Sequence, residues 1–223
     1  MDVAGIDGFG RGAWVAVVLR DGRFAEAIVG QSLAVLLRRV PGLTVGIDIP
    51  IGLPDQGNRQ ADRLARARVG KRWPSVFMTP PRRLLKESPY ESAMAAARSE
   101  GAKGLSRQAY AIGPRIFEAE RAIGEGWALH EVHPEVSFAA MADGPLDWAK
   151  VSYRGAIVRR QLLKAVGIRL PDDLGEANGV PTDDVLDAAA AAWSAARIAT
   201  GEQVRLPDPP EVFSDGLPAA ISF

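Results

Sequence analysis

The chain has 223 residues, 47% of them hydrophobic and 24% charged, which is ordinary for one large globular domain. Its 27 basic and 27 acidic residues cancel, so the overall charge indicates no class of partner, and any basic patch must be local. The lack of cysteine excludes disulfides and thiolate catalysis, and no apolar run is long enough for a membrane span. The N-terminus has no basic region followed by an apolar stretch, so no secretory signal is expected. We therefore expect a cytoplasmic protein with no membrane partner.

The N-terminal quarter predicts an antiparallel meander followed by a parallel strand. Strands are expected at 3–7, 13–19 and 24–29, with an Asp-Gly hairpin turn between the second and the third. Helical spacing follows at 31–40, and another apolar strand follows at 43–49. Because a helix separates this strand from the meander, the right-handed crossover rule places it parallel to the first strand.

The rest of the chain predicts a helical insertion and then a return to the sheet. Residues 55–126 have mostly helical spacing with a Pro-rich connection, and 127–134 have strand character. Helices are expected at 152–167 and 183–200, each closed by glycine. The Pro-rich tail at 202–223 is expected to wrap the surface.

Acidic residues stand near the ends of the predicted strands. Asp48 interrupts the apolar run "VGIDIPIGLP", and Asp7 has the same Gly-Ile-Asp setting in "VAGIDGFG". Glu131 lies late in the strand after the insertion. In open α/β sheets, sites form outside the carboxyl ends of the strands, so these three side chains are expected to converge. The last helix adds acids in its first turns: Asp183, Asp184 and Asp187.

A group of carboxylates of this kind predicts a metal site. Several carboxylates cannot ionise side by side unless a cation offsets their repulsion. Oxygen ligands favour Mg²⁺ or Mn²⁺, and two such ions support phosphodiester cleavage. Plainer interpretations remain open: a helix N-terminus favours Asp183 and Asp184 in any case, and Asp7 is also suited to cap the Gly-rich turn. Asp48 is the residue that is hardest to explain without a site.

Six segments in order resemble the DUF-429 family of predicted ribonuclease H-like nucleases: "VAGIDGFGRGAWVAVV", "VGIDIPIGLP", "ADRLARARVGKRWPSVFMTPPR", "SRQAYAIGPRIFEAE", "HEVHPEVSF" and "DDVLDAAAAAWSA". The resemblance covers about residues 3–197. It implies a single α/β domain over 1–223 of ribonuclease H-like fold. Its mixed five-stranded sheet would comprise the antiparallel meander and two parallel strands, flanked by helices, with the insertion at 55–126.

The resemblance also implies the functional residues. The catalytic and metal-binding set carries over to Asp7, Asp48, Glu131, Asp184 and Asp187. The motifs of the insertion carry over to Asp62, Arg66, Arg72, Phe77, Gln108, Arg115 and Glu118.

The insertion also has a local excess of positive charge. Residues 59–83 are rich in Arg and Lys and contain one acid, Asp62. On a helix Arg59, Arg63 and Arg66 share a face, which suits a phosphate backbone, although a solvated helix face explains such a run equally well. The expected substrate-binding residues are Arg66, Arg72, Arg82, Gln108, Arg115 and His133. The aromatic residues Trp73, Phe77 and Tyr110 could stack on bases, with a core role favoured for Phe77.

Both histidines of the chain lie in "HEVHPE". A zinc site is disfavoured because His130 and His133 would face opposite sides of a strand and no thiolate is present. His133 would share a strand face with Glu131, where it could shuttle protons or contact a phosphate, although a structural role is equally open.

The favoured hypothesis is a Mg²⁺- or Mn²⁺-dependent nuclease or phosphodiesterase that acts on nucleic acid or another phosphate-containing substrate. Two alternatives stay open. One is a non-catalytic module that binds nucleic acid or a nucleotide through the basic insertion. The other is a dimeric phosphotransferase of actin-like fold, because "DGFGRG" also resembles a phosphate-binding loop. The sequence leaves the substrate and the oligomeric state undetermined.

Overall fold

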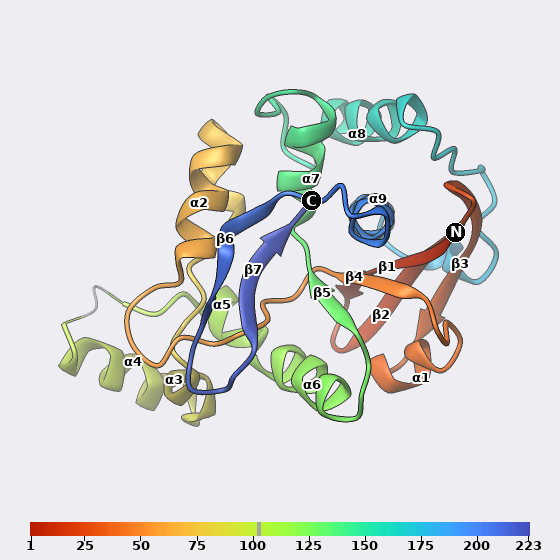
Figure 1. Ribbon diagram of the computed structural model, residues 1–223. Coiled ribbons are helices and arrows are strands. Elements are labelled where there is room, and N and C mark those ends of the chain that lie inside the picture. The colour runs from red at the N-terminus through yellow and green to blue at the C-terminus, as the bar shows by residue number, and fades with distance from the viewer. Residues whose placement is uncertain (102–103) are drawn as a thin grey trace.

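A computed structural model describes residues 1–101 and 104–223, and its centre is a five-stranded mixed sheet (Figure 1). The strands run in the order β3-β2-β1-β4-β5. Their bounds are Asp2–Phe9 (β1), Ala13–Arg20 (β2), Arg23–Gly30 (β3), Thr44–Ile47 (β4) and Leu129–Glu131 (β5). The first three strands pair antiparallel, whereas β4 pairs parallel to β1 and β5 parallel to β4. This sheet confirms the predicted α/β class and is consistent with a ribonuclease H-like fold.

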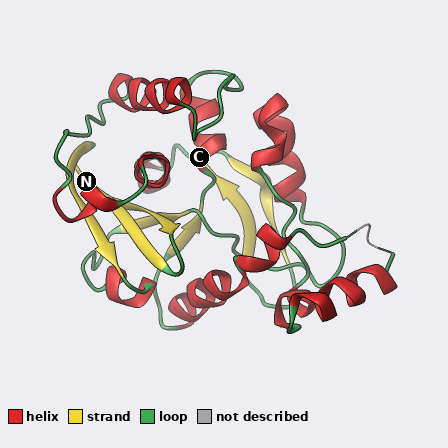
Figure 2. Ribbon diagram, turned by 180° about the vertical axis from the view of Figure 1, so that it is seen from behind, coloured by secondary structure: helices red, strands yellow, loops and turns green. Residues whose placement is uncertain are grey.

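Helices cover both faces of the sheet, because the central strands carry apolar side chains on both sides. One face packs against α1 (Leu33–Leu37) and α6 (Gly113–Gly124), around Ile6, Trp14 and Ile116. The other face packs against α9 (Thr182–Thr200), and α7 (Pro134–Met141) and α8 (Tyr153–Ala165) lie outside it. Figures 1 and 2 show this layered arrangement from opposite sides, with α9 seen along its axis.

Helix α9 approaches the strands more closely than ordinary side chains would allow. A Cβ atom on Gly5 would lie 1.9 Å from the backbone nitrogen of Ala192, and one on Gly46 would lie 2.6 Å from the oxygen of Ala191. The strands therefore need glycine where the alanine-rich face of α9 crosses them. This contact holds the first turns of α9 beside the carboxyl ends of β1 and β4.

The segment between β4 and β5 is helical, as predicted for the insertion. It comprises α2 (Gln60–Val69), the 3₁₀ helix η1 (Gly70–Ser75), α3 (Arg82–Lys86), α4 (Tyr90–Ser99), α5 (Arg107–Ala111) and α6. The helical spacing at the C-terminal end of this segment is divided between two helices, α5 and α6. Helix α6 belongs to the core beneath the sheet, whereas α3 and α4 form a small cluster of their own. The division into a domain and an insertion stays a prediction.

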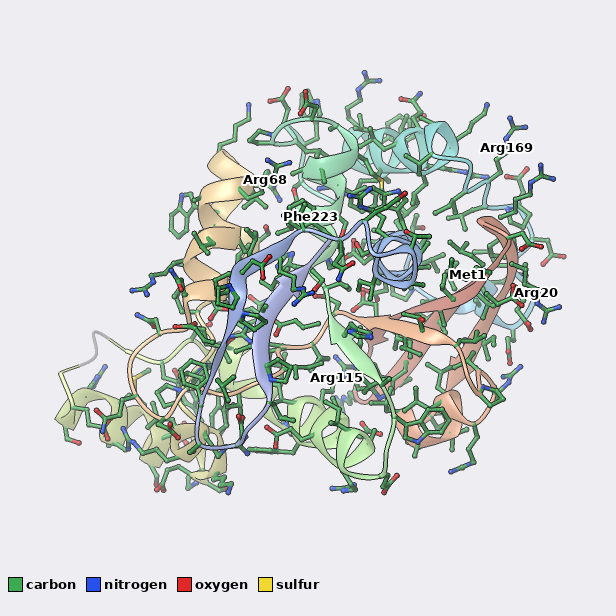
Figure 3. All side chains as sticks on the ribbon, viewed as in Figure 1. Met1, Arg20, Arg68, Arg115, Arg169 and Phe223 are labelled. Carbon is green, nitrogen blue, oxygen red and sulfur yellow. The ribbon has the colours of Figure 1, made fainter. Side chains whose placement is uncertain are left out.

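The C-terminal tail does not wrap the surface as predicted. It forms a two-stranded antiparallel sheet of β6 (Arg205–Val212) and β7 (Pro218–Ser222), and β7 packs against β5 and α2. The reason is apolar burial: Ile221 and Phe223 are buried with α2 residues, and the Arg68 guanidinium lies 5.4 Å from the Phe223 ring centroid (Figure 3). A second 3₁₀ helix, η2 (Gly175–Gly179), precedes α9. Among the described helices, none has both the length and the apolar character required to cross a membrane.

Candidate metal centre

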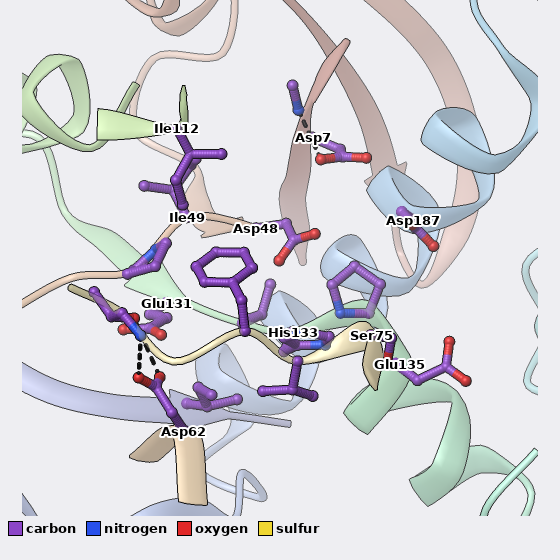
Figure 4. A pocket seen from close by; sticks show the side chains of 18 of the residues that line it. Asp7, Asp48, Ile49, Asp62, Ser75, Ile112, Glu131, His133, Glu135 and Asp187 are labelled. Atoms are coloured by element: carbon purple, nitrogen blue, oxygen red, sulfur yellow. Dashed lines mark hydrogen bonds between the residues drawn. The ribbon is translucent and has the colours of Figure 1, made fainter. Parts of the chain in front are cut away.

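Three carboxylates from three separate elements meet at one edge of the sheet. Asp7 lies near the end of β1, Asp48 directly follows β4, and Asp187 lies in the second turn of α9. One ligand oxygen from each lies within 4.8 Å of the other two. Figure 4 shows the three side chains facing the same space. The structure thus places Asp7 and Asp48 side by side, as the repeated Gly-Ile-Asp pattern predicts.

Strand alternation explains why these side chains face α9. Gly5 and Asp7 share one face of β1, and Gly46 and Asp48 share the same face of the neighbouring parallel strand. Since the two glycines admit α9 at close range, the aspartates that follow them point toward Asp187. The Asp7 carboxylate also accepts a 2.7 Å hydrogen bond from the backbone of Gly8, which fixes its orientation.

The electrostatics of the cluster favour a bound cation. Burial, reinforced by the charges of Asp48 and Asp187, raises the pKa of Asp7 well above its usual value. Burial also raises the pKa of Asp48 to about 7 and that of Asp187 to about 6. A carboxyl group whose pKa is raised in this way lacks sufficient positive charge nearby.

Lys150, in the loop between α7 and α8, supplies the one positive side chain in direct contact with the described cluster. Its Nζ donates a 2.5 Å hydrogen bond to Asp187 and lies 3.8 Å from Asp183. Although burial opposes its charged form, Asp187 raises the pKa of Lys150 above its ordinary value. Sequence reasoning missed Lys150, because a single lysine in a loop has no pattern that would identify it.

Glu131, predicted as a metal ligand, is not brought into the cluster. In the sheet register Glu131 pairs with Ile47, so it faces the opposite side from Asp48. Its two oxygens accept hydrogen bonds of 2.6 and 2.7 Å from Arg59, and one also accepts a 2.7 Å bond from the backbone of Ile51. Figure 4 shows Glu131 beside Asp62, separated from the three aspartates.

Arg59, predicted to lie on an exposed basic helix face, is buried instead. Arg59 is 1% exposed, and its guanidinium forms 2.6 Å ion pairs with both Glu131 and Asp62. The charge run alone suggested solvent exposure, but the two acids make burial of this arginine possible. Arg59 is therefore unavailable to a phosphate group.

The acids at the start of α9 take different positions. Asp187 joins the cluster, whereas Asp183 contacts Lys150 at its edge. Asp184 is outside the group of close ligand atoms, and burial raises its pKa to about 6, with Asp183 adding to the effect. The geometry favours Asp187 over Asp184 as a ligand.

The cluster opens into a cavity of about 340 Å³ that the predicted substrate-binding residues reach only in part. Arg72, Gln108, Arg115 and His133 line it. Arg115 reaches it from α6 and donates a 2.6 Å hydrogen bond to the carbonyl oxygen of Phe9. These four positions place amide, imidazole and guanidinium groups around the carboxylates.

Arg66 and Arg82 are not among the residues that line this cavity. Arg66 donates to the carbonyl oxygen of Val76 at 2.7 Å and lies over the ring of Trp73. Arg82 pairs with Glu120 at 2.6 Å and with Asp215 at 2.7 Å. Both guanidinium groups already have partners elsewhere in the fold.

The predicted strand at 127–134 is shorter than expected, which changes the setting of His133. Strand β5 ends at Glu131, and His133 stands just before α7, whose first residue is Pro134. Burial lowers the pKa of His133, so the neutral imidazole is favoured. Its Nδ1 is buried and has no hydrogen-bond partner among the described residues.

A family model described as "Protein of unknown function (DUF429)" matches residues 5–212, and the chain therefore belongs to this family. No curated protein and no solved structure matches the chain.

Proposed function

We propose that this DUF429 protein is a divalent-cation-dependent phosphodiesterase of nuclease type. The observation that carries the proposal is the convergence of Asp7, Asp48 and Asp187, with ligand oxygens within 4.8 Å of one another and one lysine in contact with them. Buried groups with strongly shifted pKa values inside a cavity are typical of functional sites.

The three side chains fit a hard cation. All the donor atoms are carboxylate oxygens, which Mg²⁺ and Mn²⁺ prefer, and their pKa values are raised first by burial and then by neighbouring carboxylates, both of which such a cation would offset. Bound there, a divalent cation would activate water and stabilise the leaving oxygen of a phosphodiester.

The surrounding residues supply binding and positioning. Arg72 and Arg115 bring positive charge to the cavity wall, where a substrate phosphate would enter. Gln108 offers an amide for hydrogen bonds to the rest of the substrate. Arg59 donates to the carbonyl oxygen of Ile51 at 3.0 Å, which steadies the segment that follows Asp48. Hydrolysis would add water across one phosphorus–oxygen bond and leave a phosphomonoester and a free hydroxyl group.

Cleavage assays with Mg²⁺ or Mn²⁺ test the proposal directly. The substrates are single-stranded, duplex, hybrid and branched nucleic acids and a small phosphodiester, bis(p-nitrophenyl) phosphate. We expect metal-dependent cleavage of at least one of them. Asp7→Asn and Asp48→Asn should each lower the rate by about 100-fold or more, because metal stabilisation of the transition state is worth several kcal/mol.

Asp172→Asn is the matched control, because the Asp172 side chain is 97% exposed and pairs with Arg160 away from the cavity. Its activity should equal that of the wild type. Full activity in both cluster variants would refute the metal site, and binding of nucleic acid without any cleavage would favour a non-catalytic module.

A further inference from the structure

Exposed aromatic side chains occur on, or directly next to, chain segments that line the cavity. Across residues 1–101 and 104–223, the aromatic side chains in the exposed class are Trp73 at 53%, Trp148 at 52% and Tyr153 at 85%. Val151, which is 78% exposed, lies among them and lines the cavity. Large exposed apolar groups that cluster in this way mark interaction surfaces.

These residues come from two segments that lie against each other although they are far apart in the sequence. Trp73 belongs to η1, and Trp148 and Val151 belong to the loop between α7 and α8. Lys71 of η1 forms an ion pair with Asp147 of the loop, and Gly70 packs against Pro145. Figure 4 shows Ser75, at the end of η1, beside His133 and Glu135 in the cavity wall. The two segments therefore form one rim of the cavity.

Positive charge is interleaved with the aromatic groups. The Arg66 guanidinium lies 5.2 Å from the centroid of the Trp73 ring, and Arg72 follows Lys71 into the cavity wall. In the sequence Lys150 lies between Trp148 and Val151, and its side chain forms a hydrogen bond with Asp187 of the carboxylate cluster. Aromatic rings with neighbouring cations are the combination that holds unpaired bases and their phosphates.

We propose that this rim, which carries Trp73 and Trp148, binds the bases of a single-stranded nucleic acid, whose backbone passes into the cavity beside Asp7, Asp48 and Asp187. This inference rests on the proposed function and names its substrate class. Bases within a duplex are already stacked on one another, so these rings favour a single strand over a duplex. The cavity, about 340 Å³, is of the size that takes a small ligand or one extended strand.

Fluorescence anisotropy with labelled 12-residue oligonucleotides tests the rim apart from catalysis. The full chain is titrated in EDTA at low salt against single-stranded DNA, single-stranded RNA and a duplex of the same sequence. We expect at least one of the two single strands to bind about 10-fold or more tightly than the duplex. Trp73→Ala and Trp148→Ala should each weaken binding by about 5- to 100-fold, which is the usual worth of one stacked base.

Conservative variants and a distant control separate stacking from folding. Trp73→Phe and Trp148→Phe keep an aromatic face and should stay within about 3-fold of the wild type. Val35→Ala, at an exposed position on α1, removes apolar surface on the other side of the sheet and should leave binding unchanged. Quenching of tryptophan fluorescence by the single strand should weaken in both Ala variants.

The outcomes distinguish this inference from the proposed function. Equal binding of duplex and single strand, with no effect of either Ala variant, would overturn the inference even if metal-dependent cleavage is found. Ala variants that change self-association in sedimentation experiments but not oligonucleotide binding would identify a protein interface and also overturn it. Tryptophan-dependent binding of single strands would support the inference even if no substrate is cleaved.

Discussion

Two groups of buried and half-buried carboxylates line the same cavity and differ in how their charge is balanced. Glu131 and Asp62 share Arg59, whose 1%-exposed guanidinium lies 2.6 Å from each of them. Within the described structure, the positive side chain in direct contact with the cluster of Asp7, Asp48 and Asp187 is Lys150, which bonds to Asp187 and is 37% exposed. The first group thus pairs two carboxylates with the fixed, fully hydrogen-bonded guanidinium of Arg59. The second group places three carboxylates beside one lysine at the cavity surface.

This difference separates a structural network from the proposed metal centre. The Arg59 network ties α2 to β5 and to the segment after β4, and Arg59 offsets its two negative charges, although burial still raises the pKa of Glu131. In the aspartate cluster burial raises the pKa of all three groups, and the positive side chain in direct contact, Lys150, donates its hydrogen bond to Asp187. A bound divalent cation would supply the charge that is missing.

The largest expected change in stability follows from disrupting the Arg59 network. Arg59→Met leaves Glu131 and Asp62 buried without a cation and should lower the free energy of unfolding by about 3–5 kcal/mol. Urea denaturation measures this loss. The matched control is Arg63→Met on the exposed side of the same helix, which should stay within about 0.5 kcal/mol of the wild type. Equal losses in the two variants would remove the distinction between the groups.

Removing a charge from the aspartate cluster should stabilise the protein, in contrast to the loss expected for Arg59→Met. With EDTA present at pH 8, Asp48→Asn should raise the free energy of unfolding by an amount on the order of 2 kcal/mol, because it removes a buried, poorly balanced charge. The pKa of Asp48 is about 7 in the folded chain, whereas the ordinary value, which applies to the unfolded chain, is 3.8. Between these two values the folded state keeps a proton on Asp48 that the unfolded state has released. Stability from this group therefore falls as the pH rises from about 4 to about 7.

The advantage of Asp48→Asn should shrink as the pH is lowered toward 4, where the wild-type carboxyl is protonated in the folded state and partly protonated in the unfolded state. Denaturation at several pH values follows this change. A variant less stable than the wild type at pH 8 would show that the Asp48 carboxylate holds the fold together, as Glu131 does.

The smallest expected effect concerns Lys150. Lys150→Met removes the partner of Asp187 and should lower stability in EDTA by about 1 kcal/mol, a modest value because the lysine is partly exposed. The same change should strengthen Mn²⁺ binding, since the lysine no longer competes for the carboxylates. Lys164→Met, at an exposed site on α8, is the control. Weaker Mn²⁺ binding in Lys150→Met would contradict this competition.

The pairing of Asp7 with Asp48 could be predicted from sequence, because two strands linked through a helix run parallel and present equivalent residues at one edge. The position of Glu131 could not, since it depends on a register in which Glu131 lies beside Ile47. The burial of Arg59 was equally hidden, because it depends on a tertiary contact with β5. The tail was mispredicted because its prolines obscured an apolar strand, of which Ile221 packs into the core.

Calorimetric titration of Mn²⁺ into the protein at pH 8 tests the central claim most directly, with Asp48→Asn and Asp172→Asn titrated alongside. We predict binding to the wild type and to Asp172→Asn, weaker binding to both at pH 5, where the cluster retains protons, and a loss of about 10- to 100-fold in affinity in Asp48→Asn. Equal affinity in the wild type and Asp48→Asn, or no binding to either, would contradict a metal centre at these three carboxylates.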